Sequence, residues 1–350
     1  MRILAIRPRA LGDVVLVTPA LRALANAAPG TEVEFATEPR YRELIEGLPH
    51  VTRIWPVERD AAGTARLVAA LRRRGFDLAV DFFGNPRSAQ IARGSGARRT
   101  AGYDLRGRAW LYDLRVPRAL EGGPGPDGRP QREYAAATHV RLAVAAGGRA
   151  DGLAAGLPRP PAAAAEAERI LAAAGVRAPA RAVGLVAAGT WPTKTWPAAN
   201  AGFLARALIE SGREVLLLSG PGEEAVSATV RRHAPAIREL PACGVGALAA
   251  VIARLGAVVG TDSGPKHVAA ALGVPTYTWY GPTHPSTWSP AGAAHAHWWT
   301  ALPCRACDRT SCPHWNCMPG LSVAEAARRV LEHLERHERS AAGLGAAAGA

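Results

Sequence analysis

Short apolar runs alternate with longer amphipathic stretches along most of this chain. In the first half, the short runs predict β-strands and the stretches between them predict helices. The strands are expected at Arg2–Arg7, Glu32–Ala36, Arg53–Pro56 and Asp77–Phe83, and the helices at Val14–Ala27, Thr64–Arg74 and Tyr134–Gly147.

The alternation continues in the second half and ends in an amphipathic helix at Val323–Arg336. Strands that alternate with helices indicate parallel sheets with helices on both faces, so the expected fold class is α/β. Two such halves predict two Rossmann-like domains facing each other across a cleft, with ligands at the carboxyl ends of the strands. The strands of this half are expected at Ala182–Val186, Glu214–Ser219, Ala257–Gly260 and Thr276–Tyr280, and its other helices at Ala198–Glu210, Glu223–His233, Gly246–Arg254 and Pro265–Leu272.

Two segments interrupt this rhythm. Gly152–Ala182 carries several prolines around an Ala-rich helix, which indicates a connection between domains. Glu121–Pro130 has the composition of a flexible surface loop. The expected division is a domain over residues 1–160, a second over 161–337, and a disordered Ala/Gly-rich tail over 338–350.

The chain is strongly basic, with a formal net charge of +13. Such a charge favours anionic partners: nucleic acid, an anionic membrane surface or a phosphorylated substrate. No nucleic-acid-binding motif accompanies it, so no nucleic-acid partner is expected. The first residues return to charge after four apolar positions, unlike a secretion signal. A cytoplasmic protein is therefore expected.

Lysine is rare in this chain. Of 42 lysines and arginines only two are lysines, Lys194 and Lys266. In a chain so biased toward arginine, they mark positions where a compact, flexible ammonium is wanted instead of a planar guanidinium. Each lies in a loop whose other residues also suggest a binding site.

Asp13 follows the first strand, after a glycine that permits a tight turn into a helix. The simpler interpretation of this aspartate is a helix N-cap. The functional one is a general base that takes a proton from an acceptor hydroxyl. The loop lacks Gly-x-Gly-x-x-Gly, which argues against a nicotinamide enzyme.

Three loops follow strands in the second half. The hydroxyls and ammonium of the first, including Thr190 and Lys194, suit a phosphate group, although an ordinary loop would look similar. In the second, Glu223 and Glu224 either stabilise a helix start or accept hydrogen bonds from a donor ribose. The third, Thr261–His267, begins a helix whose free N–H groups form an anion site.

No Asp-x-Asp motif is present in the sequence. That motif is the usual handle for a divalent ion on a sugar nucleotide. If a sugar nucleotide reacts here, its diphosphate leaves with negative charge. Lys194 and the helix start at Gly264–His267 would stabilise that charge in place of a metal ion. The expected reaction is metal-independent and needs no cofactor.

Four motifs together resemble the bacterial lipopolysaccharide heptosyltransferases, with more likeness to heptosyltransferase II than to I. These are inverting enzymes of the GT-B fold that use ADP-heptose. The motifs are Gly12-Asp13-Val-Val-Leu-Val-Thr18-Pro19, Lys194-Thr-Trp196-Pro197, Asp262-Ser263-Gly264-Pro265-Lys266-His267 and Tyr280-Gly281-Pro282-Thr283.

The resemblance implies a role for each matching residue. Asp13 would activate the acceptor hydroxyl, and Lys194 would hold the diphosphate and heptose. One of Glu223 and Glu224 would take the ribose, and Lys266 joins the donor site only through its survival as lysine. Of the remaining donor residues, Asp262 would bind heptose hydroxyls, and Ser263, Gly264 and His267 would lie at the phosphates.

The resemblance also implies the acceptor, the inner core of lipopolysaccharide (Kdo-lipid A or heptosyl-Kdo-lipid A), which carries acidic sugars. That would place the protein in the cytoplasm, peripherally at the inner face of the inner membrane. Two alternatives stay open: a related transferase with another sugar donor or acceptor, and an inactive nucleotide-sugar-binding protein. The basic residues expected to meet the acceptor or the membrane are Arg72–Arg74, Arg93, Arg98, Arg99, Arg106 and Arg108.

Four of the five cysteines form a cluster near the C-terminus. Cys304, Cys307, Cys312 and Cys317 lie within fourteen residues. In a cytosolic protein such spacing favours a metal over disulfides, and four thiolates would hold a structural zinc. Reduced buried thiols and disulfides are the alternatives.

Overall fold

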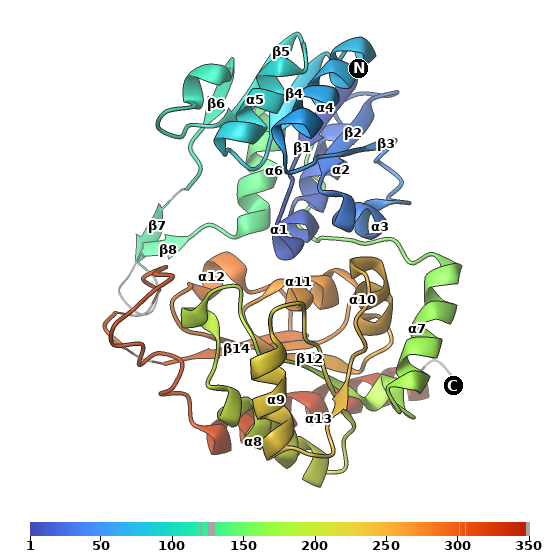
Figure 1. The fold of residues 1–350 in the computed structure, drawn as a ribbon, viewed down its shortest axis with the longest axis vertical. Helices are drawn as coiled ribbons and strands as arrows, with labels where there is room; N and C mark the ends of the chain where they lie inside the picture. Colours follow the sequence, from blue (N-terminus) through green and yellow to red (C-terminus); the bar gives the residue numbers. More distant parts are fainter. Residues whose placement is uncertain (120, 125–129, 301, 305, 348–350) are drawn as a thin grey trace. The chain divides into compact units, whose positions relative to one another are not determined.

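The computed structural model describes residues 1–119, 121–124, 130–300, 302–304 and 306–347. The chain divides into two compact units, Met1–Pro160 and Pro161–Ala350. The expected boundary between residues 160 and 161 falls at the same place. Each unit is built around a six-stranded sheet, and Figure 1 labels many of the elements.

The sheet of unit 1 has the order β3-β2-β1-β4-β5-β6, and all its strands are parallel. The order reverses between β1 and β4, and the connections there leave in opposite directions. A crevice outside the carboxyl ends is expected at such a point. The strands are β1 (Arg2–Ile6), β2 (Glu32–Thr37), β3 (Arg53–Pro56), β4 (Leu78–Asp81), β5 (Arg99–Tyr103) and β6 (Leu114–Val116).

Helices cover this sheet. One buried core joins Leu4 and Ile6 of β1 to Leu67, Leu71 and Ile91 on the helices α4 and α5, while α2 packs against α6. The helices are α1 (Leu11–Leu16), α2 (Thr18–Ala25), α3 (Arg42–Ile45), α4 (Ala61–Arg74), α5 (Pro86–Gly94) and α6 (Ala135–Ala145), with 3-10 turns η1 (Pro39–Tyr41) and η2 (Ala109–Leu111).

The prediction of a single helix at Val14–Ala27 is wrong. Two helices, α1 and α2, replace it and meet at Val17. Pro19 explains the break, because its ring nitrogen cannot donate to the preceding turn. The first helix also begins earlier than expected, at Leu11 after an N-cap at Ala10. Asp13 is therefore a first-turn residue of α1 and not its N-cap.

Several elements of unit 1 went unpredicted, among them α3, α5, β5 and β6. The β5 sequence, RTAGY, is short and only partly apolar, so its pattern is weak. A Cβ on Gly102 of this strand would overlap the ring of Tyr112, so the small residue serves close packing. The predicted loop at Glu121–Pro130 contains paired strands, β7 (Glu121–Pro124) and β8 (Pro130–Arg132), and residues 125–129 lie outside the described residues.

Unit 2 repeats the strand order of unit 1, as β11-β10-β9-β12-β13-β14, again all parallel. Its reversal lies between β9 and β12. Edge strands β11 and β14 were not predicted from the sequence. The strands are β9 (Val183–Val186), β10 (Val215–Leu217), β11 (Arg238–Glu239), β12 (Ala257–Thr261), β13 (Thr276–Tyr280) and β14 (His295–Trp299).

The core of unit 2 surrounds two buried tryptophans, Trp196 and Trp279, whose ring centroids are 5.0 Å apart. Helices α8 and α13 pack on this face, while α7 packs against α10. The Ala-rich helix of the expected connection, α7, thus belongs to unit 2. The helices are α7 (Pro161–Ala173), α8 (Ala198–Glu210), α9 (Glu224–His233), α10 (Val245–Ile252), α11 (Gly264–Ala271), α12 (Pro285–Trp288) and α13 (Val323–Ala347), with η3 (Pro179–Arg181) and η4 (Pro192–Lys194).

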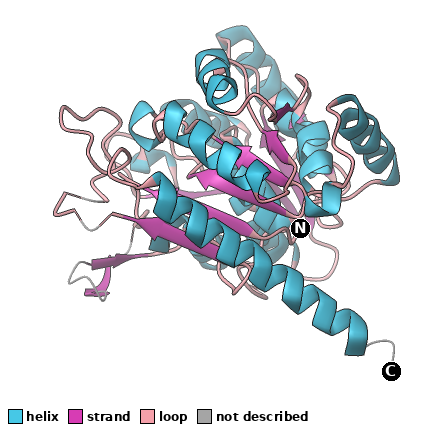
Figure 2. Cartoon of the chain, turned by 90° about the horizontal axis from the view of Figure 1, so that it is seen from below, coloured by secondary structure: helices cyan, strands magenta, loops and turns pink. Residues whose placement is uncertain are grey.

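Figure 2 shows α13 as a long helix leading to the C-terminus. It continues to Ala347, whereas the sequence predicted a disordered tail over 338–350. Alanine is the best helix former, and extending an existing helix needs no new nucleus. Residues 348–350 lie outside the described part of the chain. No helix among the described residues is long and apolar enough to cross a membrane.

Candidate active site

Asp13 lies in the first turn of α1, directly after β1 and beside the point where the strand order of unit 1 reverses. Its carboxylate is 26% exposed and forms an ion pair with Arg7, whose Nη2 lies 2.6 Å from Asp13 Oδ1. The other oxygen, Oδ2, accepts a long hydrogen bond of 3.4 Å from the Ala10 N–H. One side of the carboxylate is thus fixed and the other is open to a ligand.

Arg7 is a site residue that sequence reasoning missed. It is the last residue of the first apolar run and is buried, with 2% of its side chain exposed. Its Nη1 donates to the Phe82 carbonyl at 2.6 Å, and its guanidinium lies 4.8 Å from the centroid of the Phe83 ring. Both contacts come from the loop after β4, so Arg7 ties that loop to Asp13. The signal available in the sequence was an arginine directly after the apolar residues of the first strand.

Further cations surround the same phenylalanine. Arg9 lies 5.9 Å from the centroid of the Phe83 ring, and Arg118 Nη1 donates to the Phe83 carbonyl at 3.1 Å. Three guanidinium groups therefore gather near one carboxylate, an arrangement that suits an anionic ligand.

The arginines predicted to meet the acceptor lie mostly elsewhere. Arg72–Arg74 end α4 just before β4, and Arg93, Arg98 and Arg99 flank the start of β5. Both groups therefore lie toward the amino edge of the sheet, because helices of a parallel sheet return there. Only Arg106 and Arg108, after β5, lie toward the edge of Asp13. Arg72–Arg74 and the arginines around the start of β5 therefore lie at the opposite edge of the sheet from Asp13, which does not fit the predicted contact with the acceptor.

In unit 2 the predicted donor loops follow β9, β10 and β12 at one edge of the sheet. Lys194 ends the 3-10 turn η4 after β9, and Asp262 follows β12 across the reversal point. Their side chains meet, with Lys194 Nζ 2.8 Å from Asp262 Oδ2. Gly189 allows the tight loop, since a Cβ there would lie 2.6 Å from Lys194 Cβ. Thr190 of the same loop is exposed.

Asp262 is buried and both of its oxygens are used. Lys266 Nζ lies 2.5 Å from Oδ1, and Thr283 donates its hydroxyl to Oδ2 at 2.8 Å. Burial raises the pKa of Asp262, but the ammonium groups of Lys266 and Lys194 outweigh it and hold that pKa well below its usual range. Thr283 was missed as a site residue, although it lies in the Tyr-Gly-Pro-Thr motif.

The ammonium of Lys266 is not open to a sugar-nucleotide ligand. Its side chain is 2% exposed, and Nζ also donates to the Tyr280 hydroxyl at 2.7 Å and the Trp288 carbonyl at 2.8 Å. Together with Asp262 these partners occupy all three N–H groups of the ammonium. Burial, opposed by Asp262, lowers the pKa of Lys266 to about 8. The geometry assigns this lysine to the protein interior and not to a ligand.

Helix α11 begins at Gly264 with Ser263 as its N-cap, but the serine side chain makes no capping hydrogen bond. Among the described residues, Ser263 Oγ and His267 Nδ1 are buried without a hydrogen-bond partner. Burial, followed by the charge of Lys266, holds the pKa of His267 well below its usual range, so the imidazole is neutral. Unpaired polar atoms beside a helix N-terminus suit an anionic ligand.

Glu223 and Glu224 flank the start of α9, in the loop after β10. Glu223 Oε2 accepts from the Gly220 N–H at 2.9 Å, and burial raises the pKa of this half-buried carboxyl. Glu224 Oε1 accepts from the Gly222 N–H at 3.0 Å, which lowers its pKa, and its side chain is exposed. Neither glutamate has a hydrogen bond or ion pair with Lys194 or Asp262 in the described chain.

The cysteine-rich segment packs against the donor loops. Trp315 Nε1 donates to the Thr193 carbonyl at 3.1 Å, and Thr193 Oγ1 donates to the Arg309 carbonyl at 2.7 Å. The cysteines are free, so the disulfide alternative is not realised. Among the described residues, no group of three or more His, Cys, Asp or Glu side chains is arranged to hold a metal ion. The zinc at Cys304, Cys307, Cys312 and Cys317 stays a prediction.

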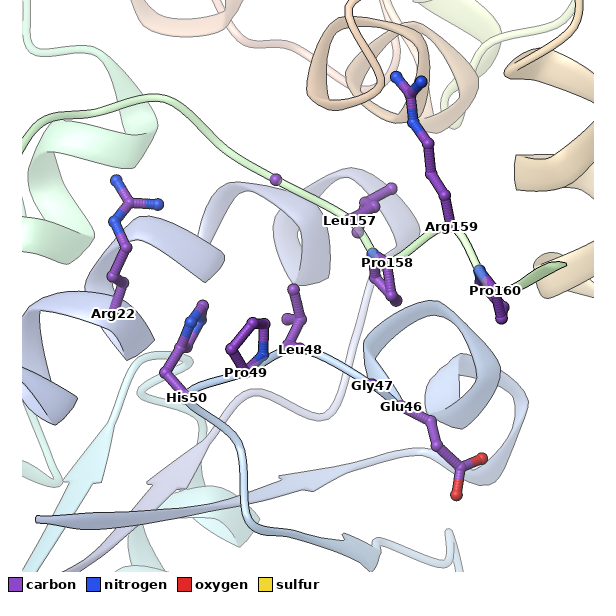
Figure 3. A pocket seen from close by; sticks show the side chains of 11 residues that line it. Arg22, Glu46, Gly47, Leu48, Pro49, His50, Leu157, Pro158, Arg159 and Pro160 are labelled. Carbon is purple, nitrogen blue, oxygen red and sulfur yellow. The ribbon is translucent and has the colours of Figure 1, made fainter. Parts of the chain in front are cut away.

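A cavity of about 580 Å³ in unit 1 contains none of the predicted site residues. Figure 3 shows Leu48 and Pro49 opposite Leu157 and Pro158, with His50 at one end. Its walls are mainly apolar residues and prolines, so it does not replace the Asp13 region as the candidate site. A smaller cavity of about 360 Å³ in unit 2 borders His284, His297 and Trp299.

The two sheets share one parallel strand order, and each has polar residues after its strands, as in a glycosyltransferase of the GT-B fold. The chain belongs to glycosyltransferase family 9 (heptosyltransferase), whose family model matches residues 64–317.

Relatives of both heptosyltransferase kinds are similar to it. Lipopolysaccharide heptosyltransferase 1 of Pseudomonas aeruginosa is 30% identical over 331 residues, which cover 90% of this chain and 88% of that protein. The structure of an E. coli ADP-heptose LPS heptosyltransferase II matches with a TM-score of 0.77 at 21% identity, over 97% of this chain and all of that one. The structure of an E. coli heptosyltransferase with ADP matches with a TM-score of 0.70 at 21% identity, over 95% of this chain and 100% of that one.

The likeness to the solved structures confirms the predicted fold class, and the family match confirms the predicted resemblance to heptosyltransferases.

Proposed function

We propose that this protein transfers heptose from ADP-heptose, with inversion, to the inner core of lipopolysaccharide. The observation that carries the proposal is the buried Lys194–Asp262 pair beside the start of α11. An ammonium, a helix N-terminus and the unpaired Ser263 hydroxyl supply donors for a diphosphate. Asp262 Oδ1 accepts from Lys266 alone among the described residues, so it has a lone pair left for a sugar hydroxyl.

In the proposed reaction, an acceptor hydroxyl oxygen attacks the anomeric carbon from the face opposite ADP. The carbon–oxygen bond to ADP breaks as the new glycosidic bond forms. The hydroxyl proton passes to Asp13, whose Oδ2 accepts one long hydrogen bond from the described residues. The leaving diphosphate gains charge, which Lys194 and the N–H groups of α11 stabilise. No metal ion takes part.

An acidic acceptor fits the cations beside Asp13. Arg7, Arg9 and Arg118 supply more positive charge there than Asp13 balances. Carboxylates and phosphates of a lipopolysaccharide core are such anions. We propose that the chain meets this acceptor as a peripheral protein at the inner face of the inner membrane, attracted by its net charge of +13.

The test is incubation of the purified protein with ADP-heptose and a panel of truncated core acceptors, read by mass spectrometry. The expected product is an acceptor heavier by one heptose, formed with release of ADP. Transfer only from another nucleotide sugar, or only to another acceptor, would favour the related transferase with a different substrate. ADP-heptose binding without any product would favour the inactive binding protein.

A further inference from the structure

The ammonium of Lys266 is enclosed by the protein. Lys266 lies one helical turn after Asp262, and its Nζ donates to Asp262, to Tyr280 and to the Trp288 carbonyl. The ring of Tyr280 adds a cation–π contact at 4.7 Å. Because an ammonium has three donors, these partners leave none for a ligand.

Lys194 differs in each of these respects. Its side chain is 10% exposed, and within the described part of the chain its ammonium has one hydrogen bond, to Asp262 Oδ2. Its other neighbours are the rings of Trp191 and Trp288, with centroids 4.6 and 5.5 Å from Nζ. Two of its three donors are therefore available to a phosphate.

The charges of this cluster do not cancel. Asp262 faces two ammonium groups, so the buried trio carries one net positive charge. Without Lys266, Lys194 and Asp262 would form a neutral pair, and the carboxylate would compete with a phosphate for the remaining ammonium. Such competition is strong in a buried site, where charges are poorly screened.

We propose that Lys266 is a positioning residue of the donor site: by holding and neutralising Asp262, it leaves the charge and two donors of Lys194 free for a diphosphate. The same ammonium fixes the end of β13 and the end of α12 through Tyr280 and Trp288. This inference rests on the proposed function, since it assumes that a nucleoside diphosphate binds at Lys194.

The experiment measures ADP binding by isothermal titration calorimetry, because ADP carries the diphosphate but lacks the sugar that Asp262 would contact. Lys266→Met is expected to weaken ADP binding roughly tenfold or more. The double variant Lys266→Met/Asp262→Asn removes one positive and one negative charge, so Lys194 keeps its net charge. It is expected to bind ADP within about threefold of the wild type, better than Lys266→Met alone.

A purely structural lysine would behave differently, because a second buried substitution would then weaken binding further. Arg213→Met, which breaks the Arg213–Glu338 ion pair elsewhere in unit 2, is the control and should leave ADP binding unchanged. Lys266→Gln keeps hydrogen-bond donors without the charge, and it serves if the methionine variant unfolds. It should lose the same affinity for ADP.

The outcomes separate the two proposals. A wild-type protein that does not bind ADP contradicts the proposed function. A wild type that binds ADP, together with Lys266 variants that bind it equally well or a double variant that does not recover, overturns the role given to Lys266.

Discussion

The buried guanidinium of Arg7 holds the partly exposed carboxylate of Asp13 at 2.6 Å. Arg7 in turn donates to the Phe82 carbonyl and stacks on the Phe83 ring. The position of the carboxylate is therefore fixed by the loop after β4 as well as by its own helix. The ion pair fixes Oδ1, and within the described part of the chain Oδ2 accepts one hydrogen bond, of 3.4 Å. A base that must accept a proton needs this combination of a fixed position and an open oxygen.

Asp13→Asn keeps the shape of the side chain and removes its basicity. We expect kcat to fall by about 10²–10⁴-fold, the usual contribution of a general base. ADP affinity should stay unchanged, because Asp13 belongs to unit 1 and the nucleotide residues to unit 2. Release of ADP in the presence of donor and acceptor measures the rate. Glu32→Gln, which breaks the Arg2–Glu32 pair at the start of β2, is the control, and wild-type turnover by Asp13→Asn would refute the base assignment.

Arg7→Met removes the buried guanidinium and leaves Asp13 without its partner. We expect a loss of roughly 2 kcal/mol in the free energy of unfolding, since a charged hydrogen bond to the Phe82 carbonyl also disappears. Turnover should fall while ADP binding persists. Urea unfolding followed by circular dichroism measures the first effect. A variant with both wild-type stability and wild-type turnover would show that the ion pair does not position the base.

Much of the fold was predictable because strand and helix periods are strong in the central elements. β1, β9 and β12 are mainly apolar, β13 alternates threonine with aromatic residues, and nearly every residue of these four strands is buried. The failures lie where local pattern is weak or overridden. Edge strand β14, HAHWW, is polar and aromatic and lies half-exposed, so no simple alternation marks it.

The site was predictable where a loop motif carries its chemistry, as in Asp262–His267. The partners of that loop were less predictable, because they come from distant segments that only the sheet order brings together. Thr283 reaches Asp262 from the loop after β13, and Lys194 reaches it from the loop after β9. The rarity of Lys266 marked a special environment, and in the structure that environment is the interior beside Asp262.

Stability is expected to fall in acid, in part through His333. Burial, followed by the charges of His337, Arg336 and His295, lowers the pKa of His333 to about 4 from 6.5. Between these pH values the unfolded chain binds a proton that the folded chain does not, so stability falls as the pH falls. One such group contributes at most about 1.4 kcal/mol per pH unit.

His333→Phe keeps the ring and removes this titration. Denaturant unfolding at a series of pH values should show a shallower decline between about pH 6.5 and 4 than in the wild type. His314→Gln, a change at an exposed histidine, should keep the wild-type slope. An unchanged slope in His333→Phe would remove this residue from the acid response.

The proposed reaction and the predicted zinc make separate claims about metals. Because Lys194 and the start of α11 supply the positive charge, EDTA should leave the initial rate unchanged, and a strict magnesium requirement would overturn the metal-free mechanism. The zinc prediction is tested by metal analysis of protein purified without oxygen. One zinc per chain, lost in Cys307→Ser, would support the four-thiolate site. Five freely reacting thiols, the four of the cluster and Cys243, would contradict it.

The two glutamates at the start of α9 should differ in their effect on the nucleotide. Glu223 is half-buried, and its Oε2 is anchored by the Gly220 N–H, so its other oxygen is held in a defined position for a ribose hydroxyl. Glu224 is exposed and bonded to Gly222, and it serves as the matched control one residue away. We expect Glu223→Gln to weaken ADP binding by roughly tenfold and Glu224→Gln to leave it unchanged.

A nucleotide without ribose hydroxyls distinguishes a ribose contact from a change in loop structure. If Glu223 binds the ribose, 2′,3′-dideoxy-ADP should bind more weakly than ADP to the wild type, and it should bind equally to the wild type and to Glu223→Gln. The reason is that the mutation then removes an interaction which this ligand cannot make. If Glu223→Gln weakens the binding of both nucleotides by the same factor, the glutamate only shapes its loop, and the ribose must be held elsewhere.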